Sequence, residues 1–224
     1  MDGGRVVAER SWHAAPGHAE TLAPLMGGLL ADAGWPVQSL DAVAVSIGPG
    51  SFTGLRVGLS VAKGLAFAAR LAVVPVPTLD ALAEVADAQP GELVCPILDA
   101  RKGEFYAALF AASERGRLEK VSDTVLVRAE DLLKRIDRRC RFLGDGVVAY
   151  TNLIEETLGH RAVVLPFAHY HPDGGVVAAL GQKRLAVDGE EPVGALEPFY
   201  VRAAYAELEK AATGPMNRVL RSAR

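Results

Sequence analysis

Hydrophobic positions along the chain alternate between the spacing of strands and the spacing of helices. The first part of the chain predicts strands at 5–11, 41–47 and 71–76 and helices at 18–33, 53–70 and 79–88. After a turn at 89–91 the pattern restarts, predicting strands at 93–98, 104–111, 118–127, 141–143 and 162–165 and helices at 129–136, 147–158 and 174–187. This alternation is typical of sheets covered by helices, so the sequence predicts an α/β protein.

The restart of the pattern indicates two lobes. We expect an N-terminal lobe over 1–92 and a C-terminal lobe over 93–194. The tail at 195–212, which begins as an extended apolar segment, is expected to pack back on the first lobe.

Small residues recur every fourth position through the second predicted helix. They are Gly50, Gly54, Gly58, Ala62 and Ala66. A helical glycine costs about 1 kcal/mol relative to alanine, so helix stability does not explain the glycines. A stripe without bulk lets another backbone come close, and that backbone belongs either to this chain's own core or to another subunit.

The first predicted helix has an apolar face broad enough to serve a partner. Its members are Leu22, Leu25, Met26 and Leu29, with a second edge at Leu30 and Ala33. Core packing alone could absorb the first face, but it explains less well why the neighbouring helix lacks bulk. We therefore interpret the two helices together as a candidate partner surface.

Composition excludes several classes of protein. The 224 residues carry a net charge of −3, which argues against a general grip on nucleic acid. Cys95 and Cys140 have no metal-ligand spacing. The N-terminus lacks the apolar core of a signal peptide, and Arg56, Lys63 and Arg70 interrupt the most apolar stretch, so we expect a soluble cytoplasmic protein.

The glycine-rich segment does not match a Walker A loop. Lys63 precedes Gly64, and no Ser or Thr follows to hold magnesium. A phosphate at the helix start stays open as an alternative, because Ser51 and Thr53 lie there with unpaired amides.

Two carboxylates provide the alternative of an enzyme. Asp99 lies at a strand-to-strand turn, and Asp145 lies between two glycines. Asp99 and the nearby Glu104 could serve acid–base chemistry, although an Asp at such a position more often starts a turn and Arg101 pairs with a nearby acid. Asp145 could approach a ligand in the cleft, but a tight turn explains it as well. His169 and His171 have no obvious third metal ligand.

Three segments together resemble the TsaB (YeaZ) family: HAETLAPL at 18–25, IGPGSFTGLRVGLSVAKGLA at 47–66 and LDARKGEFYAAL at 98–109. The likeness runs from residue 2 to about residue 205. It implies the two-lobed fold of the actin/Hsp70/sugar-kinase superfamily. It also implies work with a catalytic paralogue, TsaD, and an ATPase, TsaE, which place a threonylcarbamoyl group on N6 of adenosine 37 in tRNA.

The resemblance implies a non-catalytic scaffold without a cofactor. The hairpin at 99–103 lacks the glycine of a nucleotide-binding loop, and the His-x-x-x-His motif of the catalytic branch is absent from the sequence. Weak nucleotide binding at or near the subunit interface stays open, and tRNA contact is expected to be indirect. The first two helices are expected to bind TsaD, or a second copy when the chain is alone. The residues expected to carry these contacts are His18, Leu22, Leu25, Met26, Leu29, Gly54, Gly58, Val61, Ala62 and Leu65.

One departure from the family pattern concerns the first strand, which the family places before the turn at 2–4. The sequence lacks that strand, so we expect an unpaired edge in the first sheet. The natural full-length chain is expected to be about 20 residues longer, with the added strand covering that edge.

Overall fold

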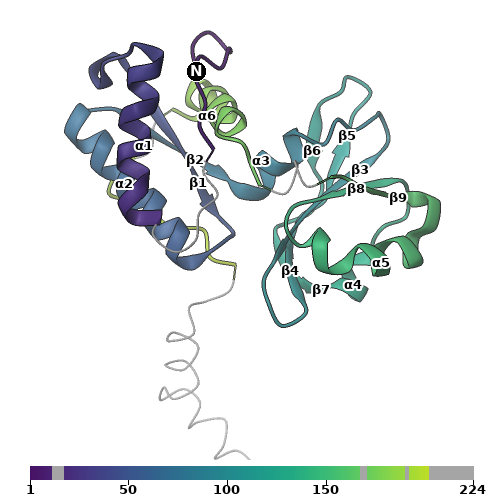
Figure 1. The fold of residues 1–224 in the computed structure, drawn as a ribbon. Coiled ribbons are helices and arrows are strands. Elements are labelled where there is room, and N and C mark those ends of the chain that lie inside the picture. The colour runs from purple at the N-terminus through teal and green to yellow at the C-terminus, as the bar shows by residue number, and fades with distance from the viewer. Residues whose placement is uncertain (12–17, 167–170, 190–191, 202–224) are drawn as a thin grey trace, which may run out of the picture.

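Two sheets, each covered by helices, form the two lobes of the chain in the computed structural model (Figure 1). The structure describes residues 1–11, 18–166, 171–189 and 192–201. Helix α3 (Thr78–Glu84) lies between the lobes. The α/β fold expected from the sequence is confirmed.

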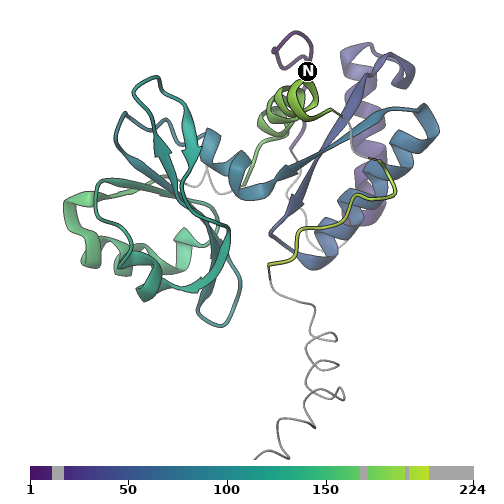
Figure 2. The same cartoon turned by 180° about the vertical axis from the view of Figure 1, so that it is seen from behind.

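The first lobe holds a parallel pair of strands between helices. Its elements are α1 (His18–Ala33), the 3-10 turn η1 (Val37–Ser39), β1 (Ala42–Gly48), α2 (Phe52–Ala69) and β2 (Ala72–Pro77). Helix α2 covers one face of the pair, where Val43, Val45 and Ile47 pack with it. Helix α6 (Gly174–Asp188) covers the other face, and Figure 2 shows it from behind.

The second lobe contains a larger mixed sheet. Its elements are β3 (Leu93–Asp99), β4 (Glu104–Ala107), β5 (Phe110–Ala112), β6 (Leu118–Lys120), β7 (Val125–Arg128), α4 (Ala129–Leu133), β8 (Cys140–Leu143), α5 (Val147–Leu158), the 3-10 turn η2 (Gly159–Arg161) and β9 (Ala162–Val164). Strand β3 pairs antiparallel with β4 and β5 and parallel with β8. The main core cluster lies between this sheet and helices α4 and α5.

The single strands predicted at 104–111 and 118–127 were wrong, because each is divided in two. The β4 residues pair with the end of β3, whereas β5 pairs with its beginning. The chain bends at Leu109, whose backbone N–H donates to Ser122 Oγ at 2.8 Å. The carbonyl of Leu109 in turn accepts from the N–H groups of Val121 and Ser122. These hydrogen bonds replace regular strand pairing at Leu109 and separate the pair β4–β7 from the pair β5–β6.

The strand predicted at 5–11 is absent from the structure, where only an isolated bridge joins Asp2 and Arg5. The segment instead links two helices. Glu9 accepts a hydrogen bond from the N–H of Gly175 at 2.9 Å, at the start of α6. The Arg10 guanidinium pairs with Asp32 of α1. The strand fails to form because no described strand pairs with it.

The outer edge of β1 is unpaired, as the sequence predicted. Within the described part of the chain, β1 pairs with β2 alone, and its residues 42–47 are half-exposed. A cavity of about 180 Å³ lies between β1 and α1. A second cavity of about 550 Å³ lies between β1 and α6. The core of this lobe is therefore open on both sides of β1.

Residues late in the chain return to the first lobe. Helix α6 packs on β1 and β2, although it falls inside the expected range 93–194. The N–H of Phe199 donates to the carbonyl of Ile47 at 2.8 Å, and Leu196 is buried in the core cluster beside α2. The lobe boundaries at 92 and 194 stay predictions.

Glu92 stabilises the start of the second lobe. Its carboxylate accepts from Arg141 Nε at 2.7 Å, Arg139 Nε at 2.8 Å and the Gln89 N–H at 2.9 Å. Burial raises the pKa of this carboxyl, but the hydrogen bonds from Arg141 and Gln89 and the charges of the two arginines outweigh burial. The pKa of Glu92 therefore lies below its ordinary value.

Glu92→Gln is expected to lower the free energy of unfolding at pH 7 by about 2 kcal/mol, because it removes a charged hydrogen-bond acceptor from a buried site. The folded-state pKa is depressed, so this stabilisation is complete above the ordinary pKa of 4.5 and is lost as pH falls through the folded-state pKa. Urea unfolding at several pH values should show the difference between the two proteins shrinking below pH 4.5. Glu156→Gln, at an exposed position of α5, is the control. A difference that does not change with pH would contradict this assignment.

Candidate partner interface

The small-residue stripe of α2 divides between the core and the surface. Each fourth residue advances about 40° around a helix, so a stripe of this spacing winds around its axis. Ala62 and Ala66 are 4% and 1% exposed, and Ala66 belongs to the core cluster between α2 and the sheet. Ala62 is therefore nearly covered within the chain itself, and its contact with a partner stays a prediction. Gly54 is exposed and Gly58 is half-exposed.

The glycines on the outward side of α2 are not required by this chain's own packing. A Cβ atom built at Gly58 or Gly64 would meet nothing within 4 Å. At Gly54 it would meet only Ser51, the residue that caps the helix by accepting a hydrogen bond from the Gly54 N–H at 3.3 Å. The absence of bulk at these positions leaves room for a partner backbone rather than for this chain.

A groove of about 320 Å³ separates α1 from the beginning of α2. It is lined by Thr21, Leu22, Leu25, Ser51, Gly54, Val57 and Gly58. The sequence predicted Leu22, Leu25, Gly54 and Gly58 as contact residues, and the structure brings these four together. Two leucines on one wall and two glycines on the other form a surface that fits the apolar ridge of another helix.

Other predicted contact residues point away from this groove. Met26 and Leu29 of α1 and Leu65 of α2 line the cavity beside the open edge of β1. Val61 is half-buried. The His18 side chain lies outside the described residues. Helical spacing alone could not separate the residues that face the sheet from those that face the groove, because both sets are apolar.

Two further apolar residues of α2 were not predicted as contacts, and only Val57 lies on this surface. Val57 lines the groove one turn after Gly54, a spacing that could have identified it. Phe67 is 83% exposed near the end of α2. Phe67 lies about 180° around the helix axis from Gly58, so it faces away from the groove.

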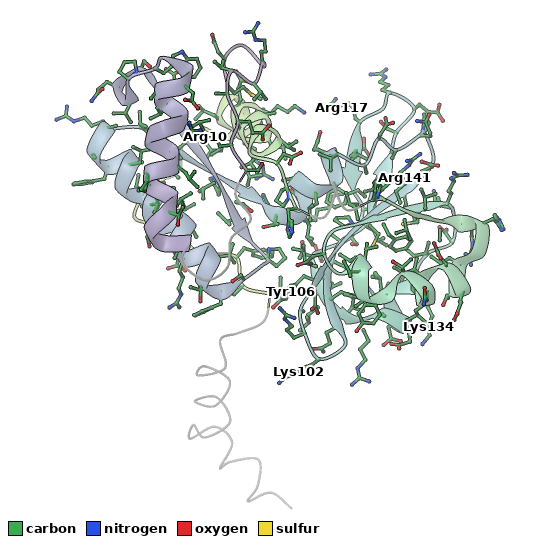
Figure 3. The ribbon with its side chains drawn as sticks, viewed as in Figure 1. Arg10, Lys102, Tyr106, Arg117, Lys134 and Arg141 are labelled. Carbon is green, nitrogen blue, oxygen red and sulfur yellow. The ribbon has the colours of Figure 1, made fainter. Side chains whose placement is uncertain are left out.

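The two candidate acid–base residues hold a hairpin in place. Asp145 Oδ1 accepts from the Asp99 N–H at 3.0 Å, and Asp99 Oδ1 accepts from the Arg101 N–H at 2.8 Å. Arg101 also pairs with Asp99 at 3.3 Å. Figure 3 shows Lys102 at the tip of this hairpin and Tyr106 further along β4. The contacts explain both carboxylates structurally.

Other chemistry is not apparent in the part of the chain that the structure describes. No group of three or more His, Cys, Asp or Glu side chains there could hold a metal ion. Both cysteines are buried, and burial together with the neighbouring Cys95 raises the pKa of the Cys140 thiol. His169 lies outside the described residues. Within the described residues, no helix has the length and apolar character that a membrane span requires.

Comparison with known proteins supplies the family context. The family model described as "TsaD: tRNA N6-adenosine threonylcarbamoyltransferase" matches residues 12–210. The chain is 33% identical over 205 residues to the tRNA threonylcarbamoyladenosine biosynthesis protein TsaB of Bacillus subtilis (strain 168), covering 90% of this chain and 87% of the relative. It is 32% identical over 186 residues to the protein of that name in Haemophilus influenzae, covering 79% and 78%.

A solved structure agrees with these relatives. YeaZ from Pseudomonas aeruginosa superposes with a TM-score of 0.71 at 27% identity, covering 85% of this chain and 87% of that one. The likeness confirms the two-lobed fold that the sequence predicted.

Proposed function

The chain belongs to the TsaB family, and from this membership we propose that it is a non-catalytic scaffold subunit for tRNA N6-threonylcarbamoyladenosine synthesis. Its role lies in that biosynthesis, as the names of its relatives state. We propose further that it binds the catalytic paralogue TsaD and acts together with the ATPase TsaE to modify adenosine 37. The site of this work is the cytoplasm, where tRNA is modified, and contact with tRNA is indirect.

The outward face of α2 is the observation that carries the proposal. The helix presents glycines whose Cβ positions open into empty space, beside a groove walled by Leu22 and Leu25 of α1. Burying apolar groove surface stabilises association by roughly 25 cal/mol per Å² before the costs of binding. A helix of TsaD occupies this surface in the complex. When TsaD is absent, the same two helices pair with those of a second copy.

The rival function is a cleft enzyme of the same superfamily, a small-molecule kinase or a peptidase using Asp99 or Asp145. One solved relative is described as similar to "peptidase YEAZ". The structural roles of both carboxylates in the hairpin favour the scaffold instead.

Asp145→Asn tests whether this carboxylate acts as a general base in the modification reaction. Asparagine retains an oxygen that can accept from the Asp99 N–H but cannot act as a general base. In a reaction reconstituted with TsaD, TsaE, ATP, tRNA and the threonylcarbamoyl donor, we expect the variant to support modification within about twofold of the unmodified chain. Loss of a general base would lower the rate by about 100-fold or more.

Omission of the chain from the same reaction tests the scaffold role. We expect modified adenosine, measured by mass spectrometry of digested tRNA, to fall to background without it. Undiminished modification by TsaD and TsaE alone would contradict the proposed function.

A further inference from the structure

A second groove lies on the side of α2 opposite α1. The tail residues 192–201 run along the helix there, as Figure 2 shows. The groove measures about 410 Å³. Its polar and aromatic lining comes from Arg56, Ser60, Lys63, Glu197 and Tyr200.

Aromatic rings and an arginine gather at the end of this groove. The rings of Phe52 and Tyr200 stack with centroids 5.4 Å apart. The Arg56 guanidinium lies 4.0 Å from the centre of the Phe52 ring, and its Nε donates to the Tyr200 hydroxyl at 3.0 Å. Yet Phe52, Phe199 and Tyr200 are 43%, 40% and 36% exposed. The cluster is therefore ordered by its own contacts while much of its apolar surface stays open to solvent.

We propose that this tail groove is the second half of the surface that binds the partner subunit. The inference rests on the proposed function. Helix α2 lies between the two grooves, and its outward face borders both. Ser51 and Gly54 line one groove, while the adjacent Phe52 belongs to the aromatic cluster of the other. A subunit broad enough to cover the outward face of α2 therefore contacts the tail as well as α1.

The chemistry of the tail groove favours a protein over RNA. Tyrosine, phenylalanine and arginine are the side chains enriched at the centres of protein interfaces. The charged residues that line the groove are Arg56, Lys63 and Glu197, so its net charge is only slightly positive. Binding of a phosphate backbone favours a larger positive charge. Among the described residues neither cation forms an ion pair. The partner is expected to present an apolar ridge with a carboxylate near Arg56 and Lys63.

Binding of the chain to immobilised TsaD tests the inference. Tyr200→Ala and Arg56→Ala should each weaken the affinity by about 10-fold, because the cluster loses a ring or its charge. Tyr200→Phe retains the ring and should lose less. Arg117→Ala removes an exposed arginine on a hairpin of the second lobe (Figure 3) and should bind like the unmodified chain. Hydrogen exchange of the unmodified chain should slow at residues 196–200 when TsaD binds.

The other possible results would overturn this inference, the proposed function or both. Substitution of Gly58 in α2 by leucine should block the first groove. If that variant loses TsaD binding while Tyr200→Ala and Arg56→Ala bind TsaD as well as Arg117→Ala does, and hydrogen exchange in the tail is not slowed, then the interface ends at α2. The proposed function then stands and the inference falls. Failure of the unmodified chain to bind TsaD overturns both. Variants that bind TsaD normally but lower the affinity of the complex for tRNA would assign the tail groove to RNA.

Discussion

Gly58→Leu is expected to abolish partner binding while leaving the fold intact or slightly more stable. Leucine is a far better helix former than glycine, so the free energy of unfolding should rise by up to about 1 kcal/mol. No atom within 4 Å of the Cβ position opposes the new side chain in the isolated protein. In the complex, the leucine would occupy the groove that the partner helix needs, and affinity for TsaD should fall by about 100-fold or more.

Gly27→Leu is the matched control for this substitution. Gly27 is also a helical glycine with an open Cβ position, but it does not line the groove and lies about 200° around α1 from Leu25. Gly58→Ala should give an intermediate loss of affinity. Light scattering and urea unfolding measure the association and the stability of each variant. A Gly58→Leu protein that still associates normally would remove the outward face of α2 from the interface.

Gly144→Ala is expected to lower the free energy of unfolding of the second lobe by about 4 kcal/mol or more. Replacement of this glycine is thus expected to destabilise the protein, whereas replacement of Gly58 is not. Gly144 has φ +99°, and a Cβ atom there would lie 2.2 Å from the carbonyl oxygen of Ile97. That oxygen belongs to the central strand β3, which cannot shift without disturbing its pairing with β8. Both backbone strain and a direct clash therefore oppose the methyl group.

Gly116→Ala separates the two causes. Gly116 also has a positive φ, +69°, but nothing lies within 4 Å of its Cβ position. The Gly116→Ala variant should be destabilised only by the cost of holding alanine at a positive φ, about 1 kcal/mol. Urea unfolding should place the Gly144 variant far below the Gly116 variant. Equal losses would mean that the approach to Ile97 is not a constraint.

The sequence predicted elements best where periodicity and flanking residues agree. Helix α5 occupies residues 147–158, as expected, because a glycine precedes and another follows its apolar pattern. Helix α1 was predicted for the same reason, since Gly34 follows its apolar pattern. The bends that divide 104–111 and 118–127 could not be predicted, since they depend on which part of β3 each half pairs with.

The structure brings together only some of the residues predicted to contact a partner. Leu22, Leu25, Gly54 and Gly58 line one groove, while Met26 and Leu29 turn toward the open edge of β1. A helical pattern shows that a face is apolar but not what covers it. The tail was expected on the first lobe, but its aromatic contacts with α2 involve residues 144 positions apart in the sequence, such as Arg56 and Tyr200, and no local pattern relates them.

The most direct test of the scaffold account is size-exclusion chromatography with light scattering on the chain mixed with TsaD, followed by an assay of ATP turnover on the isolated chain. A scaffold subunit should form a 1:1 complex that replaces the separate species, and the chain alone should not hydrolyse ATP. A folded chain that forms no complex with TsaD, or one that hydrolyses ATP without partners, would contradict the scaffold role.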